Sequence, residues 1–309
     1  RPLLSSPQQA QNSATESSSE TQKGLLFAVG AYGIWGIAPI YFVWVGFAGP
    51  LEILANRIVW AIPLLLLLLG LTKQWAGVWR LTRAQLAILV ATAVALSINW
   101  LTFIWAIQAE KIAEASLGYY INPLVNVILG WLFLQERMRP LQWLAIGVAA
   151  FGIATELVVQ ASVPWLGLTL AMSFGIYGLL RKKVNLPAVV GLFIETLLVL
   201  PIALGYLILL YLDQGTRTFV DGASLALGGV ITVIPLVFFA AAATRLPLTT
   251  LGFVQYLAPT CALLLAIFLY DESVPAIRWF TFSMIWLAVV IFSVENVYQY
   301  RKRGLGDAK

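Results

Sequence analysis

Two ionisable residues fall inside long apolar stretches, where a charge could bind a solute, carry a proton or move a gate. Arg57 lies in EILANRIVW, and Glu195 lies in GLFIETLLVL. A charge at the centre of a membrane span costs about 3 kcal/mol on insertion scales, so such a residue indicates function by default. We therefore predict a coupling or gating role for Arg57 and for Glu195.

The depth of these two residues limits how they can interact. At about 1.5 Å per residue, their backbones would lie on the order of 9 Å apart in depth across a ~30 Å core. Direct pairing of Arg57 with Glu195 then requires neighbouring helices. The alternative is that Arg57 extends toward Glu52 and Glu195 toward Lys182 or Lys183, as long side chains do near a helix end.

Two prolines stand near the middle of apolar stretches with polar residues around them. Pro123 and Pro259 lack an N–H and clash with the carbonyl four residues earlier, so we predict helix breaks at both. Lipid cannot satisfy the freed carbonyls, and matched broken helices indicate a transporter binding site. The residues predicted to bind substrate there are Tyr119, Tyr120, Asn122, Gln255 and Tyr256, with Asn126 nearby. The alternative is a pair of packing kinks sealed by neighbouring helices.

Four further residues are candidates for the wall of a substrate-binding pocket. Asn99 and Trp100 fall midway along an apolar stretch, where an asparagine needs a partner on another helix or on a ligand. Trp35 and Tyr177 lie between the glycines of YGIWGI and FGIYGL, two near-copies with glycines three apart. Such glycines let helix backbones approach closely in lipid, so close packing is the alternative reading of this motif.

The composition restricts the chemistry that these residues can serve. Of the 309 residues, 61% are hydrophobic and 11% are charged, against about 25% charged in soluble domains. The chain has no histidine and one cysteine, Cys261, which excludes histidine metal sites, histidine-based catalytic triads and a disulfide framework. No G-x-x-x-x-G-K-[ST] nucleotide loop occurs. We expect no metal, no cofactor and no catalytic residue, and an intramembrane enzyme is kept only as an alternative.

The apolar segments have the length of membrane spans, since a bilayer crossing takes roughly 20 mostly apolar residues. Ten segments qualify: 24–43, 51–71, 85–107, 115–134, 141–158, 164–180, 187–211, 222–243, 248–270 and 276–296. With the N-terminus inside, 15 of the 19 Lys and Arg fall on the inner side and three on the outer side. Cytoplasmic loops retain Lys and Arg, so both termini are predicted to be cytoplasmic. The positive charge then reflects topology, and no nucleic acid partner is expected.

The chain contains two related halves. AIQAEKIAEASLGY at 106–119 aligns with AAAATRLPLTTLGF at 240–253, and Pro63 aligns with Pro201. Each half holds five spans, an odd number, so the second half must enter the membrane inverted, as in many transporters. We predict an all-α integral membrane protein with ten transmembrane helices in two inverted five-helix repeats. Its parts are a disordered polar tail at 1–22, repeats at 23–160 and 161–298, and a basic cytoplasmic tail at 299–309.

Several motifs, in order, resemble one transporter family. They are KGLLFAVGAYGIWGIAPIYF, EILANRIVW, NWLTFIWA, EASLGYYINPLVNVILGWLFLQER, YGLLRKK and AAATRLPLTTLGFVQYLAPT, within residues 23–303. They resemble RarD-type proteins of the EamA branch of the drug/metabolite transporter superfamily. The resemblance implies a permease of the bacterial inner membrane with a central substrate cavity, in a group linked by name to chloramphenicol sensitivity or resistance. The family commonly has a histidine where this chain has Asn56, so a proton-coupling role of that histidine cannot be carried over.

These observations together predict a multi-pass protein of the bacterial inner membrane whose partners are the lipid bilayer and a small-molecule substrate. We expect a secondary active or facilitative transporter of a small organic metabolite or drug, working by alternating access, with export as the expected direction. If a proton is the coupling ion, Glu195 is the expected carrier, because a desolvated carboxyl holds its proton more tightly. The alternative function is a channel-like pore for small solutes, which would need a continuous polar lining.

Overall fold

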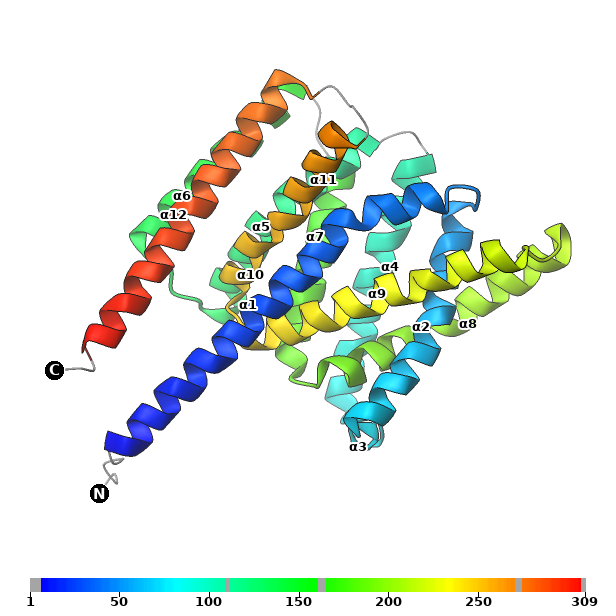
Figure 1. Cartoon of the computed structure of the whole chain (residues 1–309), viewed down its shortest axis with the longest axis horizontal. Coiled ribbons are helices and arrows are strands. Elements are labelled where there is room, and N and C mark those ends of the chain that lie inside the picture. The colour runs from blue at the N-terminus through cyan, green and yellow to red at the C-terminus, as the bar shows by residue number, and fades with distance from the viewer. Residues whose placement is uncertain (1–6, 109–111, 161–164, 270–273, 307–309) are drawn as a thin grey trace.

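The computed structural model describes residues 7–108, 112–160, 165–269 and 274–306, which form helices and turns without a strand (Figure 1). The helices are α1 (Pro7–Trp44), α2 (Pro50–Thr72), α3 (Trp75–Trp79), α4 (Arg83–Gln108), α5 (Ile112–Leu134), α6 (Pro140–Gln160), α7 (Trp165–Val184), α8 (Ala188–Gln214), α9 (Phe219–Arg245), α10 (Leu248–Gln255), α11 (Leu257–Phe268) and α12 (Ala276–Gly306). A helix satisfies its backbone hydrogen bonds internally, which lipid requires of any spanning segment.

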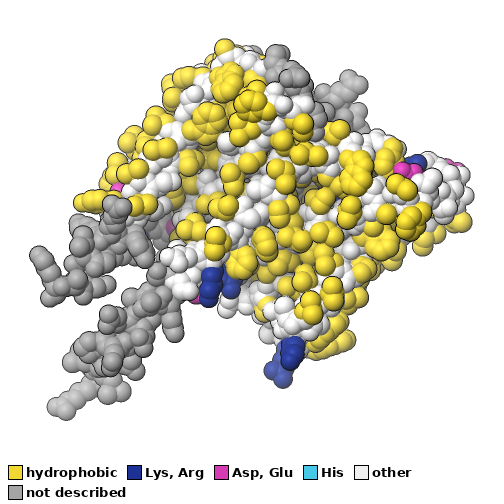
Figure 2. All heavy atoms as spheres, in the orientation of Figure 1, with side chains coloured by type: hydrophobic (Ala, Val, Ile, Leu, Met, Phe, Trp, Pro, Cys, Tyr) yellow, Lys and Arg dark blue, Asp and Glu magenta, His cyan; other side chains and the backbone are white. Residues whose placement is uncertain are grey.

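Eight helical stretches in the described residues are long and apolar enough to cross a membrane. They lie in α1 from Ser19 onward, in α2, α4, α6, α8, α9 and α12, and across α10 and α11 together. The other long helices are α5 and α7, and α7 carries three basic residues in its last turn. Figure 2 shows hydrophobic side chains spread over the visible face, with Lys and Arg near its edges. The described residues are all helix or turn and are consistent with the predicted class, an all-helical membrane protein.

The first helix begins earlier than the sequence predicted. α1 starts at Pro7, so residues 7–22, predicted to belong to a disordered tail, are helical instead. Glu20 lies 2.7 Å from the Nζ of Lys23 and 2.9 Å from the Nε of Arg245. Helix propagation is easier than nucleation, so the apolar span extends into its polar N-terminal neighbour. The N-terminal end of α1 and the C-terminal end of α12 lie on the same side of the bundle (Figure 1).

α6 and α12 form an antiparallel pair that two ion pairs hold at opposite ends. Arg139, just before α6, lies 3.4 Å from Glu295 near the end of α12. Arg278, at the start of α12, lies 3.4 Å from Glu156 near the end of α6. Glu156 follows Arg139 by 17 positions, and Glu295 follows Arg278 by the same 17. The two ion pairs are therefore equivalent: each joins the arginine at the start of one helix to the glutamate 17 positions after the arginine of the other helix.

The two proline-containing helices differ from each other. α10 and α11 meet at Tyr256, three residues before Pro259. α5 runs through Pro123 without interruption, which corrects the break predicted there. The hydroxyl of Tyr256 donates to the carbonyl of Tyr120 at 3.4 Å, so a neighbouring helix supplies a partner beside the proline. A Cβ on Gly252 would lie 2.7 Å from the carbonyl oxygen of Pro123, so this glycine is what allows α10 to approach α5 so closely.

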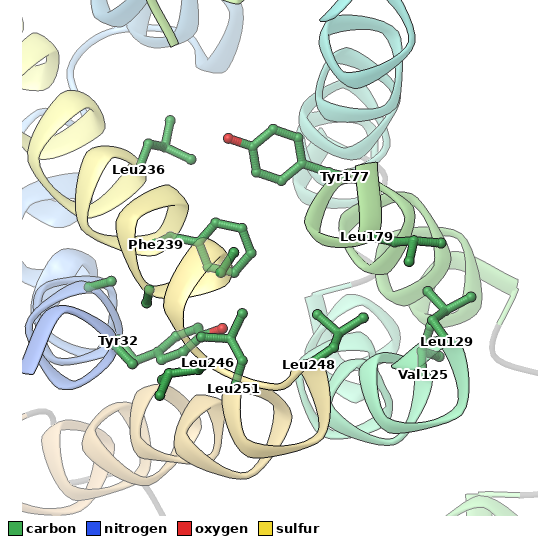
Figure 3. Close-up of a cluster of buried hydrophobic side chains, with 14 of the residues drawn as sticks. Tyr32, Val125, Leu129, Tyr177, Leu179, Leu236, Phe239, Leu246, Leu248 and Leu251 are labelled. Atoms are coloured by element: carbon green, nitrogen blue, oxygen red, sulfur yellow. The ribbon is translucent and has the colours of Figure 1, made fainter. Parts of the chain in front are cut away.

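The centre of the bundle is a core of aromatic and aliphatic side chains, where Tyr177 of α7 lies against Phe239 of α9 (Figure 3). Trp35 also contacts Phe239, with ring centroids 6.0 Å apart, against 5.7 Å for Tyr177 and Phe239. A Cβ on Gly36 would lie 2.5 Å from a side chain of α11, and one on Gly175 2.7 Å from a side chain of α5. The repeated glycine motif thus brings two aromatic rings from different halves of the chain onto one phenylalanine.

Candidate functional site

A narrow cavity lies between α2, α4, α8 and α9. Its volume is about 20 Å³, which is room for about one water molecule, so this conformation is nearly closed around it. Most of its wall is aliphatic, and the polar or aromatic groups on the wall are Ser97, Trp100, Glu195, Thr196 and Thr232. Two of the four helices come from each half of the chain, so the cavity lies where the halves meet.

Glu195 is the carboxylate of the cavity wall, and it is 2% exposed. Its Oε1 lies 3.6 Å from the Nη1 of Arg181, which is 1% exposed. The hydroxyl of Thr92 donates to the same Oε1 at 2.6 Å, and the phenol of Tyr177 lies beside the carboxylate. Glu195 therefore pairs with Arg181, one of the basic residues predicted for the inner side, and not with Arg57.

Arg57 lies behind another part of the wall. Its Nε donates to the Oγ1 of Thr232 on α9 at 2.7 Å. The guanidinium stands over the rings of Phe42 and Trp100, 5.3 and 5.8 Å from their centroids. Contacts of this kind are worth about 0.5–2 kcal/mol each. Glu52, toward which Arg57 could have extended, is engaged by another arginine.

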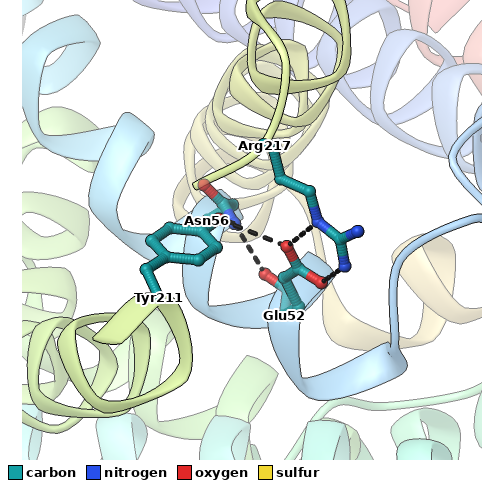
Figure 4. Close-up of polar contacts among 4 residues, drawn as sticks. All are labelled: Glu52, Asn56, Tyr211 and Arg217. Carbon is teal, nitrogen blue, oxygen red and sulfur yellow. Dashed lines mark hydrogen bonds and ion pairs between the residues drawn. The ribbon is translucent and has the colours of Figure 1, made fainter. Parts of the chain in front are cut away.

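A polar clamp of Glu52, Asn56, Tyr211 and Arg217 joins the start of α2, the end of α8 and the loop before α9 (Figure 4). Arg217 donates to Glu52 twice, from Nε to Oε1 at 2.8 Å and from Nη2 to Oε2 at 2.6 Å. Tyr211 donates to Oε1 of Glu52 at 3.3 Å, and Asn56 donates to the Tyr211 hydroxyl at 3.1 Å. The hydrogen bonds to Glu52 raise the pKa of Arg217 above its ordinary value, so the clamp remains charged at physiological pH.

Breaking the clamp should open this end of the bundle. Replacement of Arg217 by Gln removes two charge-assisted hydrogen bonds, each worth about 1.5–3 kcal/mol. In a Cys261→Ser background, a Ser97→Cys substitution places a thiol on the cavity wall. We expect the Arg217→Gln variant to react with a membrane-impermeant maleimide about tenfold faster from the clamp side. Arg217→Lys, which keeps the charge but loses the two-pronged geometry, should be intermediate, and an unchanged labelling rate would contradict a gating role.

The residues predicted near the two prolines gather mainly at the contact between α5 and α10. Four of them are buried: Tyr120, Asn122, Gln255 and Tyr256. The side-chain nitrogen of Asn126 donates to the Oε1 of Gln255 at 2.7 Å, which ties the two helices together. None of these residues belongs to the cavity wall described above. Tyr119 lies instead near Arg57, with which it interacts electrostatically. A substrate-binding role for this group stays a prediction.

The other predicted pocket residues separate. Trp100 lies on the cavity wall. Asn99 donates to the carbonyl of Leu170 at 2.9 Å and to the hydroxyl of Ser173 at 3.1 Å, and so holds α4 against α7. Trp35 packs in the aromatic core, whereas Tyr177 reaches from that core to the buried ion pair. The structure thus brings together Trp100, Glu195 and Tyr177, with Arg57 behind the wall.

Comparison with known proteins places the chain in a family. The EamA-like transporter family model matches residues 22–156. An uncharacterized transporter of Vibrio cholerae serotype O1 is 47% identical over 289 residues, which cover 92% of this chain and 96% of the relative. Protein RarD of Escherichia coli K12 is 42% identical, over 92% of this chain and 98% of the relative. The chain belongs to the RarD-type permeases of the EamA family. It is therefore a membrane transporter, as the sequence predicted.

Two further comparisons give a more distant RarD relative of this permease and a solved structure with a similar fold. The chloramphenicol-sensitive protein RarD of Pseudomonas aeruginosa is 30% identical, covering 91% of this chain and 97% of the relative. A crystal structure of a protein that is 17% identical superposes with a TM-score of 0.68, over 89% of this chain and 96% of that one. At that identity the likeness shows a shared fold alone.

Several functional candidates in this permease were not predicted from the sequence: Thr92, Arg181, Tyr211, Arg217 and Thr232. Asn56, which stands where the family commonly has a histidine, lies in the clamp. The sequence did offer one indication for Arg181. It stands first in the basic run RKK and so falls within the last turn of α7, not in the loop after it. The hydroxyl and phenol groups gave no comparable signal, because such residues are common in spans.

Proposed function

We propose that this permease is a secondary transporter that moves a small organic metabolite or drug by alternating access across the bacterial inner membrane, in the export direction. In this proposal the ten spans form two inverted five-helix repeats, 23–160 and 161–298, with both termini cytoplasmic. The clamp of Glu52 and Arg217 then closes the outer end, and Glu195 lies in the inner half of the membrane.

The observation that carries the proposal is the cavity between α2, α4, α8 and α9. Binding sites of inverted-repeat transporters lie near the bilayer midplane where the repeats meet. The cavity lies between two helices from each half of the chain, and it combines an apolar wall with a few polar groups, as small-molecule sites do. Its volume of about 20 Å³ is too small for an organic solute, so we take the conformation to be a closed one from which the carrier opens.

The packing of equivalent helices supports the inverted arrangement. In the proposed repeat, α8 is the equivalent of α2, and α9 is the equivalent of α4. α2 packs extensively along α9, whereas the equivalent contact of α8 with α4 is much smaller. An inverted-repeat carrier resting in one access state should show this inequality, and exchange of the two contacts would open the cavity to the other side.

The ion pairs between α6 and α12 support the same arrangement. Arg139 with Glu295 and Arg278 with Glu156 are each 3.4 Å apart at opposite ends of one helix pair. Two inverted copies of one Arg-to-Glu spacing produce such reciprocal contacts without further requirements. We propose that this pair is held rigid while the four helices around the cavity move.

Reconstitution tests the function directly. Purified protein in liposomes should move at least one solute from a panel of amino acids, organic acids and amphipathic drugs faster than empty vesicles do, with a rate that saturates at high concentration. A steady single-channel conductance would instead favour the channel-like pore. If no solute moves faster than in empty vesicles under gradients of either direction, the proposed function fails.

A further inference from the structure

Arg57 is an intramembrane cation whose possible counter-ions are engaged elsewhere. Glu52, five positions earlier, is bound by Arg217 at 2.6 Å, and Glu195 is bound by Arg181 at 3.6 Å. Among the described residues, the guanidinium of Arg57 hydrogen-bonds only to Thr232, through Nε. Its two Nη groups therefore remain without a hydrogen-bond acceptor in that part of the chain. This is an expensive arrangement in lipid.

The position of this guanidinium relates it to the cavity. Thr232, its hydrogen-bond partner, and Trp100, over whose ring it stands, both line the cavity, and so does Ile58, the next residue in sequence. The remaining wall near these residues is aliphatic, with Ala61 and Val233. A solute in an opened cavity would thus meet an apolar, aromatic surface with an unpaired guanidinium at its edge.

The backbone of α9 is shaped to admit the arginine. A Cβ on Gly228 would lie 2.6 Å from the Cγ of Arg57 and 2.7 Å from the hydroxyl of Tyr41. Only glycine leaves that space, so the arginine stem passes between α2 and α9 to reach Thr232. The hydroxyl of Tyr41 donates to the carbonyl of Ser224 on α9 at 3.3 Å, which fixes the other side of the passage.

We propose that Arg57 binds the carboxylate of the transported solute, which makes the substrate class of this permease small carboxylic acids with an apolar or aromatic body. This inference rests on the proposed transport function. A guanidinium presents a planar fork that matches a carboxylate through two parallel hydrogen bonds. The two free Nη groups supply that fork, while Nε stays on Thr232. The solute then provides the counter-ion that the protein lacks there.

The opposing account makes Arg57 a purely structural residue that the rings of Phe42 and Trp100 stabilise. That account expects no preference for charged solutes and a loss of stability when Arg57 is replaced. The proposal instead expects that replacing Arg57 does not destabilise the ligand-free protein. Arg57→Gln removes an uncompensated charge, so its unfolding temperature without ligand should equal or exceed that of wild type.

Ligand pairs that differ only in charge provide the test. The purified full chain in detergent is titrated with benzoate, phenylacetate, indole-3-acetate and hexanoate, each beside its own amide, and thermal unfolding is followed. We expect at least one acid to stabilise the protein with a half-saturating concentration at least about tenfold below that of its amide. Arg57→Gln should abolish that preference, and Arg57→Lys should retain part of it. The absence of a preference in every pair, or its survival in Arg57→Gln, would overturn the proposal.

Two glycines on α9 give a matched control that leaves Arg57 itself in place. Gly228→Ala should displace the arginine stem and lower the affinity for the acid, whereas Gly222→Ala, where a Cβ meets nothing within 4 Å, should leave the affinity unchanged. Equal affinity in both variants would count against the site. Arg57-dependent acid binding without flux in liposomes would sink the transport function alone, whereas flux that is indifferent to solute charge would sink only the carboxylate site.

Discussion

Replacement of Arg181 by Met is expected to lower the free energy of unfolding by about 3–5 kcal/mol, because it leaves a buried carboxylate without its partner. Arg181 and Glu195 are 1% and 2% exposed, and their charged atoms lie 3.6 Å apart. Both side chains are thus almost fully shielded from bulk water. Unfolding of the purified protein in detergent, followed by helicity across a denaturant titration, measures the loss. A change below about 1 kcal/mol would contradict the assignment of these residues as a pair.

The double variant separates lost charge balance from lost packing. Arg181→Met combined with Glu195→Gln removes both charges, and such replacements are often neutral, so most of the lost stability should return. Gly191 offers an independent route, because a Cβ there would overlap the Nη1 of Arg181. Gly191→Ala should therefore destabilise strongly, whereas Gly205→Ala on the same helix, where a Cβ meets nothing within 4 Å, should not.

The helical segments could be predicted because lipid imposes one simple rule on them. The segments expected at 51–71 and 141–158 are found as α2 (Pro50–Thr72) and α6 (Pro140–Gln160). Length and apolar composition alone define such a helix. The ends were less certain where the composition becomes polar, and α1 accordingly extends back to Pro7.

The partners of the buried charges could not be predicted, because pairing depends on helix rotation and on which helices are neighbours. The membrane depths estimated from sequence position did not exclude a pairing of Arg57 with Glu195. In the structure, Glu195 pairs with Arg181. The missing side chain of Gly191 leaves room for Arg181 to turn inward from the end of α7. A basic run at a helix end usually indicates a cytoplasmic loop. This general rule does not distinguish Arg181, which faces inward, from the two lysines that follow it.

The effect of a proline on its helix could not be predicted either, because it also depends on the neighbouring helices. A proline removes a hydrogen bond and introduces a clash, but a neighbouring helix decides whether the chain breaks. Pro123 stays inside α5, where the Tyr256 hydroxyl contacts the carbonyl of Tyr120. The cavity lies on other helices, between α2, α4, α8 and α9. Two residues of the predicted set line it, Trp100 and Glu195. Their prediction rested on position within an apolar stretch, beside Asn99 for Trp100 and on charge for Glu195, and not on proximity to a proline.

Replacement of Glu195 by Gln is expected to remove the response of transport to a pH gradient. Under the proposed function, Glu195 is the carboxyl that both lines the cavity and holds the inner ion pair, through Thr92 at 2.6 Å and Arg181 at 3.6 Å. Protonation would cancel its charge and release Arg181, which changes how α8 is held against α7 and α4. A solute and a proton that both act on this carboxyl become coupled, because each changes the free energy of the other's binding.

Vesicles with an imposed pH gradient make that coupling measurable. Wild type should accumulate a transported solute several-fold over the no-gradient level, since one pH unit stores about 1.4 kcal/mol per proton. Glu195→Gln should show no accumulation but retain exchange of labelled for unlabelled solute, because glutamine keeps the shape of the neutral carboxyl. That variant also leaves Arg181 unpaired, so Arg181→Met with Glu195→Gln serves as the stability control and should behave identically. Full gradient dependence in either variant would exclude Glu195 as the proton carrier, and its absence in wild type would indicate a facilitator that runs down the solute's own gradient.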